Sequence, residues 1–132
     1  MLTSYGTAYV AKLLVAQATP PLGLYLAFTT NIPSALDTGS TLAEPTAADY
    51  ARYSLGVDTF WSAPLVGQDT TYYQWTIDIF PVATWGSILG YAICDALTAG
   101  NAILVEELPT PITMGAGQHI SVDSNSLRIR TY

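Results

Sequence analysis

The sequence predicts a mainly β fold, an antiparallel β-sandwich or jelly-roll-like domain with one N-terminal helix. Three observations predict this class. Several short segments alternate apolar and polar residues with period two, and Gly, Pro, Asn and Asp recur between these segments. Helical spacing of apolar residues is confined to residues 1–20. We expect residues 1–132 to form a single domain, with a helix and an arm in residues 1–20 and the sandwich in residues 21–132.

The first element is the helix. Thr3 or Ser4 can cap it, and the prolines at 20–21 are expected to end it. Its apolar side chains fall on one broad face: Tyr9, Val10, Leu13 and Leu14. This stripe is wide for a surface helix, so we expect it to pack against a sheet or a neighbouring subunit.

The next segment, residues 22–30, alternates as a strand does. Leu22, Leu24, Leu26 and Phe28 point one way, and Tyr25 and Ala27 point the other. Residues 31–49 are rich in Pro, Ser, Thr, Ala and Gly, which predicts a long loop that is functional or mobile and suited to contact a partner. Residues 50–57 are predicted to form a second strand. One side of it would carry Ala51, Tyr53, Leu55 and Val57, and the other Tyr50, Arg52 and Ser54.

The second half continues the β pattern. Residues 60–71 are irregular, and residues 74–80 alternate, with Trp75, Ile77 and Ile79 expected to point inward. Residues 87–94 and 102–108 flank a turn-rich segment and predict a central hairpin. Pro109 and Pro111 are expected to break the chain before two short strands at 118–123 and 126–131.

The composition limits the classes of partner. Only 11% of the residues are charged while 50% are hydrophobic, so we expect part of the surface to be buried against other chains. A net charge of −6 argues against nucleic acid as a partner. No apolar run is long enough to span a bilayer and no basic signal region precedes the first one, so we expect a mature, soluble protein without membrane contact.

Catalytic and metal-binding devices are not recognisable in the sequence. His119 is the only histidine and Cys94 the only cysteine, too few for a zinc site, and no carboxylate spacing resembles an EF-hand. We interpret His119 as a structural or surface residue and Cys94 as a buried apolar one. Glu106 and Glu107 are adjacent on a strand, so they point to opposite faces and cannot form a catalytic pair. We therefore expect no enzyme activity, no catalytic residues and no cofactor.

The candidate functional residues are those expected to form interfaces. They are aromatic, apolar or cationic side chains on the helix, on two predicted strands and in the irregular segment: Tyr9, Leu13, Leu14, Tyr50, Arg52, Trp61, Arg128 and Arg130. Arg128 and Arg130 share one strand face, so they either meet an acidic neighbour or are solvated. The 12 Tyr and Trp residues could also stack on a host glycan, although such residues equally fill sandwich cores.

Four stretches resemble a known family. They are LGLYLAFTT, DYARYSL, DIFPVATWGSILGYAICDALTAGNAILVEEL and PTPITMGAGQHISV. Together they resemble small virion proteins of tailed bacteriophages, described as tail-fibre-like or capsid decoration (cement) proteins. The resemblance implies a β-sandwich that serves as a structural part, commonly a homotrimer, without an active site. Residues 31–49 and 60–73 depart from the pattern, so it implies nothing about their contacts.

Two placements in the virion follow from this resemblance. We expect a capsid decoration protein on the outer capsid surface, bound to the major capsid protein, because the fold is self-contained and the chain has neither heptads nor repeats of a fibre shaft. The alternative is a tail or tail-fibre component that contacts the host surface.

Overall fold

The fold is mainly β and antiparallel with one N-terminal helix, as predicted. A computed structural model describes residues 1–57, 60–62, 70–124 and 126–130. Its elements are α1 (Ser4–Leu14), β1 (Tyr25–Thr29), β2 (Tyr53–Ser54), β3 (Thr70–Tyr72), β4 (Ile77–Ile79), β5 (Gly86–Cys94), β6 (Ala102–Met114), β7 (Ile120–Val122) and β8 (Arg128–Arg130). The predicted irregular segment 60–71 lies partly outside the described residues, and its last two residues belong to β3.

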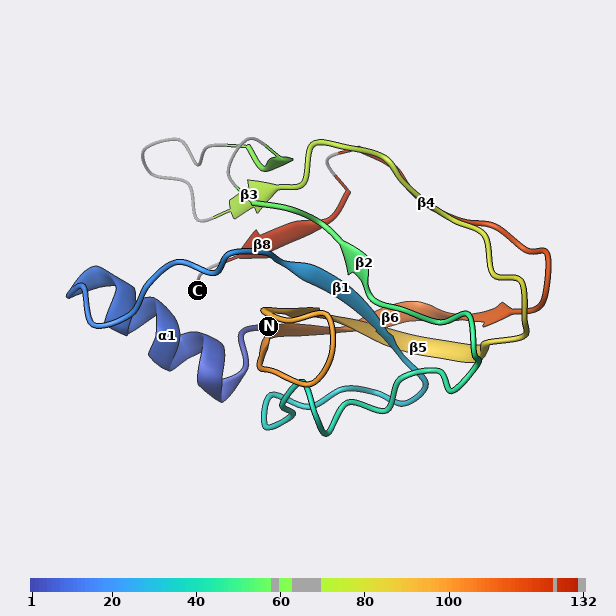
Figure 1. Cartoon of the computed structure of the whole chain (residues 1–132), viewed down its shortest axis with the longest axis horizontal. Coiled ribbons are helices and arrows are strands. Elements are labelled where there is room, and N and C mark those ends of the chain that lie inside the picture. Colours follow the sequence, from blue (N-terminus) through green and yellow to red (C-terminus); the bar gives the residue numbers. More distant parts are fainter. Residues whose placement is uncertain (58–59, 63–69, 125, 131–132) are drawn as a thin grey trace.

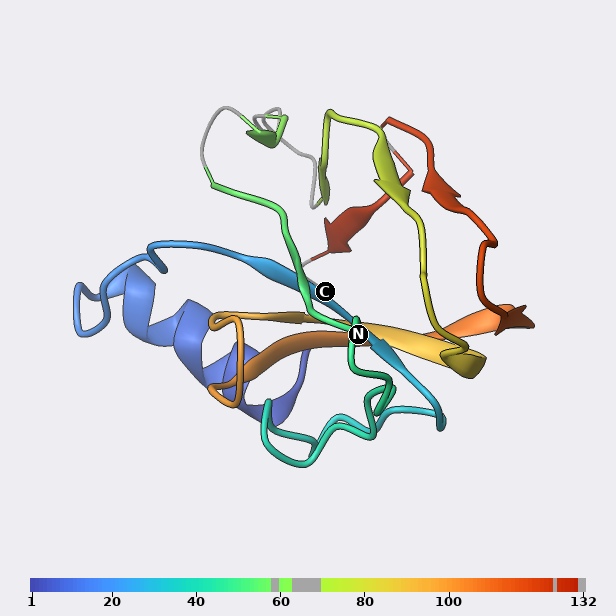
Figure 2. The ribbon, with the colours of Figure 1, turned by 45° about the vertical axis from the view of Figure 1, so that its right-hand side comes forward.

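The strands form two layers. One layer is a four-stranded sheet in the order β2-β1-β5-β6, and its centre is the predicted hairpin of β5 with β6. The other consists of two two-stranded ladders, β3 with β8 and β4 with β7. Figures 1 and 2 show these ladders on one side of the four-stranded sheet. The two strands predicted at 118–123 and 126–131 therefore pair with different partners.

The main core lies between the layers. Leu26 and Phe28 of β1 join Ile77 of β4 and Ile120 of β7 in one buried cluster. Ala27 points to the opposite face of the sheet and belongs to a second cluster. This confirms the alternation predicted for β1, because period-two geometry sends successive side chains to opposite faces. Leu22 lies before the strand and is fully exposed.

The predicted long loop is present and covers the other face of the sheet. Leu42 of this loop packs on Ala27, Ala92, Cys94, Ala102 and Val105, and Figure 2 shows the loop on the side opposite the ladders. Backbone hydrogen bonds fix it: Thr30 N donates to the Ala43 carbonyl (2.7 Å), and Gly39 N donates to the Gly100 carbonyl (3.1 Å). The loop thus supplies a covering layer on this face of the sheet.

Helix α1 lies against β6 through its first turn. Thr3 is the N-cap, and its hydroxyl accepts a hydrogen bond from Gly6 N (2.9 Å). Leu2 pairs with Leu104, so the chain ahead of the helix adds to the edge of β6. A Cβ atom on Gly6 would lie 2.1 Å from the Ile103 carbonyl oxygen, so only glycine permits this approach.

The helix ends before the prolines that were expected to stop it. Gln17 N donates to the Lys12 carbonyl (2.9 Å) and Ala16 N to the Leu13 carbonyl (3.2 Å), the two bonds of a Schellman motif. Ala16 adopts the left-handed conformation that this motif requires, with φ of 56°. Because alanine rather than glycine stands at this position, the usual sequence signal of the helix end is missing.

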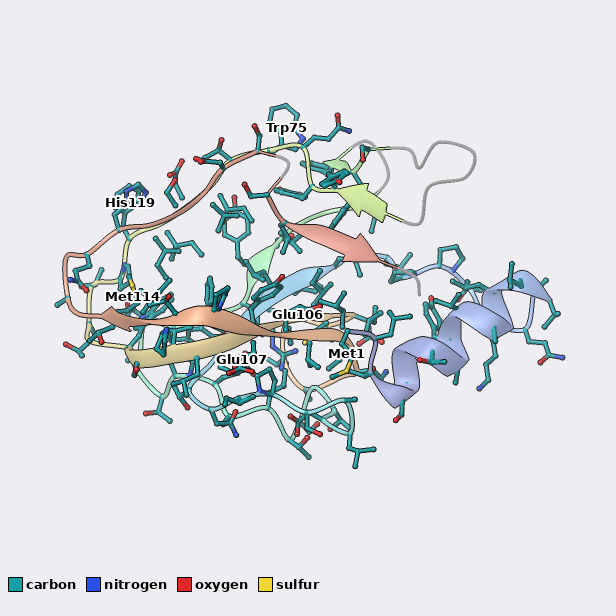
Figure 3. The ribbon with its side chains drawn as sticks, turned by 180° about the vertical axis from the view of Figure 1, so that it is seen from behind. Met1, Trp75, Glu106, Glu107, Met114 and His119 are labelled. Atoms are coloured by element: carbon teal, nitrogen blue, oxygen red, sulfur yellow. The ribbon has the colours of Figure 1, made fainter. Side chains whose placement is uncertain are left out.

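Three strand predictions were wrong in detail. Trp75 is 58% exposed and points away from the sheet, as Figure 3 shows, because β4 begins only at Ile77. The segment 50–57 has just two residues in a strand, and Arg52 rather than Ala51 is buried. Strand β6 continues past both prolines to Met114. Proline has no N–H to donate, but β6 lies at the edge of the sheet and its register against β5 shifts between Ile88 and Gly90. The strand therefore tolerates the missing donors.

Candidate functional site

A cavity lies beside α1. It is an open cleft of about 460 Å³ between the helix, residues 17–22 and the turn after β5, and we call it the α1 cleft. Its polar and aromatic lining side chains are Tyr5, Tyr9, Lys12, Gln17 and Asp95. In Figure 1 the chain leaves the end of α1 and runs back alongside the helix toward β1, which forms one wall of this cleft.

Two tyrosines form the aromatic wall of the α1 cleft. Tyr5 and Tyr9 are four residues apart on α1, so they share a face, and their rings stack with centroids 5.6 Å apart and planes at 14°. The Tyr9 hydroxyl donates to the Thr19 carbonyl, which ties the returning segment to the helix. Burial raises the pKa of both phenols, and the negative charge of Asp95 raises it further.

Asp95 is held in place by the turn that it begins. Its carboxylate accepts hydrogen bonds from the backbone N of Asn101 (2.8 Å) and from the Asn101 side-chain amide (2.9 Å). These bonds fix the carboxylate at the cleft beside Tyr5. Lys12 lines the same cleft, so it contains one negative and one positive side chain.

A second polar cluster is buried around Arg52 and joins the long loop to the turn between β5 and β6. Arg52 donates to both carboxylate oxygens of Glu44 (3.0 and 2.8 Å) and to the carbonyl oxygens of Gly39 (2.7 Å), Ala96 (2.8 Å) and Ala99 (2.9 Å). Only 5% of Arg52 is exposed. Burial disfavours the charged guanidinium, but the bonds to Glu44 outweigh burial and raise the pKa of Arg52. The cluster therefore locks the long loop to the turn between β5 and β6.

Tyr50 belongs to the same cluster. Its hydroxyl donates to Glu44 (2.7 Å) and accepts from Phe28 N (3.1 Å). Burial and then the bond to Glu44 raise the pKa of this phenol. Tyr50 and Arg52 are both among the predicted interface residues. In the structure their side chains have partners inside the chain, because Glu44 lies within reach of both.

The remaining interface candidates are spread over the molecule. Leu13 is half-buried on α1, whereas Leu14 at its end is 85% exposed. Trp61 packs edge-on against Tyr73 with ring centroids 5.4 Å apart, and its indole N–H donates to the Gly56 carbonyl. Arg128 and Arg130 lie in β8, opposite Tyr72 and Thr70 of β3. Only Tyr9 lines the α1 cleft; the stacking partner Tyr5 was missed, although its spacing of four from Tyr9 was a usable signal.

His119 and Cys94 are not part of the α1 cleft. His119 lies at the surface (Figure 3). Its ring stacks on Phe80 with ring centroids 4.2 Å apart and contacts Asp78 at 2.8 Å. Cys94 is buried, and burial raises the pKa of its thiol to about 11. These placements confirm a surface histidine and a buried apolar cysteine.

In the described part of the chain, no group of three or more His, Cys, Asp or Glu side chains could hold a metal ion. Among the same residues, no helix combines the length and the apolar character needed to cross a bilayer.

Comparison with known proteins places the chain in a family. A family model described as podophage GP4 fiber I protein gp80 matches residues 3–130. A search of curated proteins found no match. The matched region includes α1, all eight strands and both polar clusters described above. It confirms the tailed-phage virion character that the four sequence stretches indicated, and its description names a fibre protein rather than a capsid decoration protein. The chain therefore belongs to the family of the podophage GP4 fiber I protein gp80.

Proposed function

We propose that this chain is a structural component of a podophage tail, as part of a fibre or of its attachment to the tail. The observation that carries this proposal is the fibre-family match over residues 3–130. The sequence also favoured a capsid decoration role bound to the major capsid protein. The fibre description supports the tail alternative instead, and with it a structural rather than an enzymatic role.

We also propose that the chain works as a homo-oligomer, with a trimer favoured. Three separate segments each expose a large apolar side chain to solvent. These side chains are Leu14 at the end of α1, Leu36 in the long loop and Val82 between β4 and β5, each at least 80% exposed. Contact with other copies or with tail proteins would remove this apolar surface from water, which is favourable by roughly 25 cal/mol per Å². The small charged fraction of the chain supports the same conclusion.

Labelling of purified virions tests the location. Gold-conjugated antibodies raised against the chain should decorate the tail in electron micrographs, while antibodies against the major capsid protein decorate the heads of the same particles. Quantitative mass spectrometry of these virions should give far fewer copies of the chain than of the major capsid protein.

The opposite labelling result would favour placement on the capsid. Gold distributed over the head, with copy numbers comparable to those of the major capsid protein, would overturn the tail proposal. Absence of the chain from purified virions would overturn both placements.

A further inference from the structure

The α1 cleft has the size and composition of a small-molecule site. Its volume of about 460 Å³ lies within the roughly 300–1,000 Å³ typical of ligand pockets. The second cavity, of about 170 Å³, is smaller and is lined mainly by apolar residues of the core such as Phe28, Ile120 and Leu127. The α1 cleft, unlike this second cavity, combines aromatic rings with charged and amide side chains.

The side chains of the α1 cleft discriminate between classes of ligand. Tyr5 and Tyr9 offer ring faces and phenol groups, which suit a ligand with an apolar face and polar edges. Asp95 accepts hydrogen bonds, Lys12 donates them and Gln17 does both. One negative and one positive side chain cancel, so neither a phosphate nor a strongly cationic ligand is favoured.

The cleft is also preorganised, which reduces the entropy lost on binding. The Tyr9 hydroxyl bonds to the Thr19 carbonyl and so fixes the distance between the two walls. The Schellman motif fixes the exit of the chain from α1, and Asn101 holds the carboxylate of Asp95. Each wall is thus set by a hydrogen bond that does not involve a ligand.

We propose that the α1 cleft binds a neutral saccharide, with the ring C–H face of the sugar against the tyrosines and its hydroxyl groups on Asp95, Gln17 and Lys12. Pyranose sugars combine an apolar face with hydroxyl groups that donate and accept, and this matches the side chains of the cleft. Binding by the isolated chain does not require a particular place in the virion. The use of the cleft for contact with host glycans does rest on the tail location proposed above.

Saturation-transfer difference NMR on the full chain tests the proposal. The probes are glucose, galactose, N-acetylglucosamine and the β-1,4-linked disaccharides of glucose and of N-acetylglucosamine. At least one probe should receive saturation, mainly at the C–H protons of one ring face. Replacing the aromatic wall in Tyr5→Leu should weaken this binding about tenfold, the effect expected when an aromatic contact is lost.

Trp75→Leu is the matched control. Trp75 is also an exposed aromatic residue, but it lies outside the α1 cleft, so its removal should leave the affinity unchanged. Gln17→Ala provides a second variant in an exposed position where folding is not at risk, and it should weaken binding several-fold. Circular dichroism establishes that each variant is folded.

Three results would overturn the proposal. The first is the absence of saturation transfer to every probe. The second is equal weakening by Tyr5→Leu and Trp75→Leu, because the sugar would then contact exposed aromatic residues in general. The third is unchanged binding in both Tyr5→Leu and Gln17→Ala, because the sugar would then bind at a different place. None of these results bears on antibody labelling of the tail, so failure here leaves the proposed tail role standing.

Discussion

Ala16 carries a conformational cost that the Schellman motif imposes on it. Its φ of 56° places the backbone in the left-handed region, where the alanine Cβ crowds a carbonyl oxygen at a cost of roughly 1–2 kcal/mol. Glycine has no such penalty but loses more backbone entropy on folding, about 0.4–1 kcal/mol. The first effect is larger, so the end of α1 is a place where the native residue is not the most stabilising one.

We predict that Ala16→Gly raises the free energy of unfolding by about 0.5–1 kcal/mol. Urea titration followed by circular dichroism measures the change. The matched control is Ala11→Gly within the exposed part of α1, which should lower stability by about 1 kcal/mol because its backbone is helical. If both variants lost stability equally, the left-handed cost at Ala16 would be refuted.

Asp49 is a residue whose charge organises the segment before β5. Its carboxylate accepts hydrogen bonds from Val82 N (2.7 Å), Ala83 N (3.3 Å) and the indole N–H of Trp85 (3.2 Å). The hydrogen bond from Val82 N, together with those from Trp85 and Ala83, lowers the pKa of Asp49 below its ordinary value, although desolvation acts in the opposite direction. Trp85 is a core residue, so Asp49 also orients part of the main core.

We predict that Asp49→Asn destabilises the protein at neutral pH and flattens its acid dependence. A carboxyl with a lowered pKa stabilises the fold above its unfolded pKa of about 3.9, and this contribution disappears as the pH falls through the lower folded pKa. The stability difference between the two proteins should therefore be constant above about pH 5 and shrink below about pH 4. Urea titrations across this range measure it.

Glu107→Gln is the control for this experiment. Glu107 is an exposed carboxylate on β6, so its neutralisation should leave both stability and acid dependence nearly unchanged. A difference between wild type and Asp49→Asn that persisted unchanged to the lowest pH would contradict the assigned role of the Asp49 charge.

At the scale of elements, the contact between α1 and β6 depends on one glycine. The Ile103 carbonyl oxygen occupies the space that a side chain at Gly6 would need. Two backbone pairings continue this contact ahead of the helix, from Thr3 N to the Ile103 carbonyl (2.9 Å) and from Val105 N to the Met1 carbonyl (2.9 Å). The helix and the chain ahead of it therefore dock as one unit.

We predict that Gly6→Ala displaces this unit from β6. The added methyl group meets a backbone atom that cannot rotate away, and such overpacking costs about 1–3 kcal/mol. Amide hydrogen exchange should accelerate at Thr3 and Val105, whose N–H groups form the pairing. Gly115→Ala is the control, since the nearest atom to its new Cβ lies at 3.6 Å. Unchanged exchange in Gly6→Ala would show that the helix adjusts without leaving the strand.

The buried Arg52 cluster works at the same scale. It joins residues 39 and 44 of the long loop to residues 96 and 99 of the β5–β6 turn through side-chain and carbonyl contacts. The same turn begins with Asp95 and so positions one wall of the α1 cleft. The ion pair that orders the loop layer therefore also stabilises the surroundings of the candidate site.

At the scale of the whole molecule, the surface carries little charge and several exposed apolar side chains. Only 11% of the residues are charged, and the side chain of Leu22 is fully exposed to solvent. Association that buries such groups is driven by the hydrophobic effect, which salt does not screen as it screens charge pairs.

We predict that light scattering gives an oligomer, most simply three times the 14.1 kDa of the single chain, at both low and high salt. The variant Leu14→Gln/Val82→Gln removes two of the most exposed apolar groups and should shift the mass toward that of one chain. A single-chain mass for the wild type at high protein concentration would contradict oligomerisation, whichever virion part contains the protein.

The sequence by itself determined the class of fold, because that class depends on local periodicity. The alternation in residues 22–30, the apolar run in residues 87–94 and the capped helix at the N-terminus are properties of neighbouring residues. The structure has strands at Tyr25–Thr29 and Gly86–Cys94 and a helix capped by Thr3 in these places. The Cys94 and His119 placements followed from the same local patterns, and the four sequence stretches led to the correct phage virion family.

Only the tertiary structure decided which side chains meet. The α1 cleft joins Tyr5 to Asp95, 90 positions later, and the buried cluster joins Arg52 to carbonyl groups more than 40 residues away. Trp75 faces solvent and β6 passes two prolines because strand ends and bulges depend on partner strands. Periodicity reports the face on which a side chain lies, but it carries no information about the distant segment that covers that face.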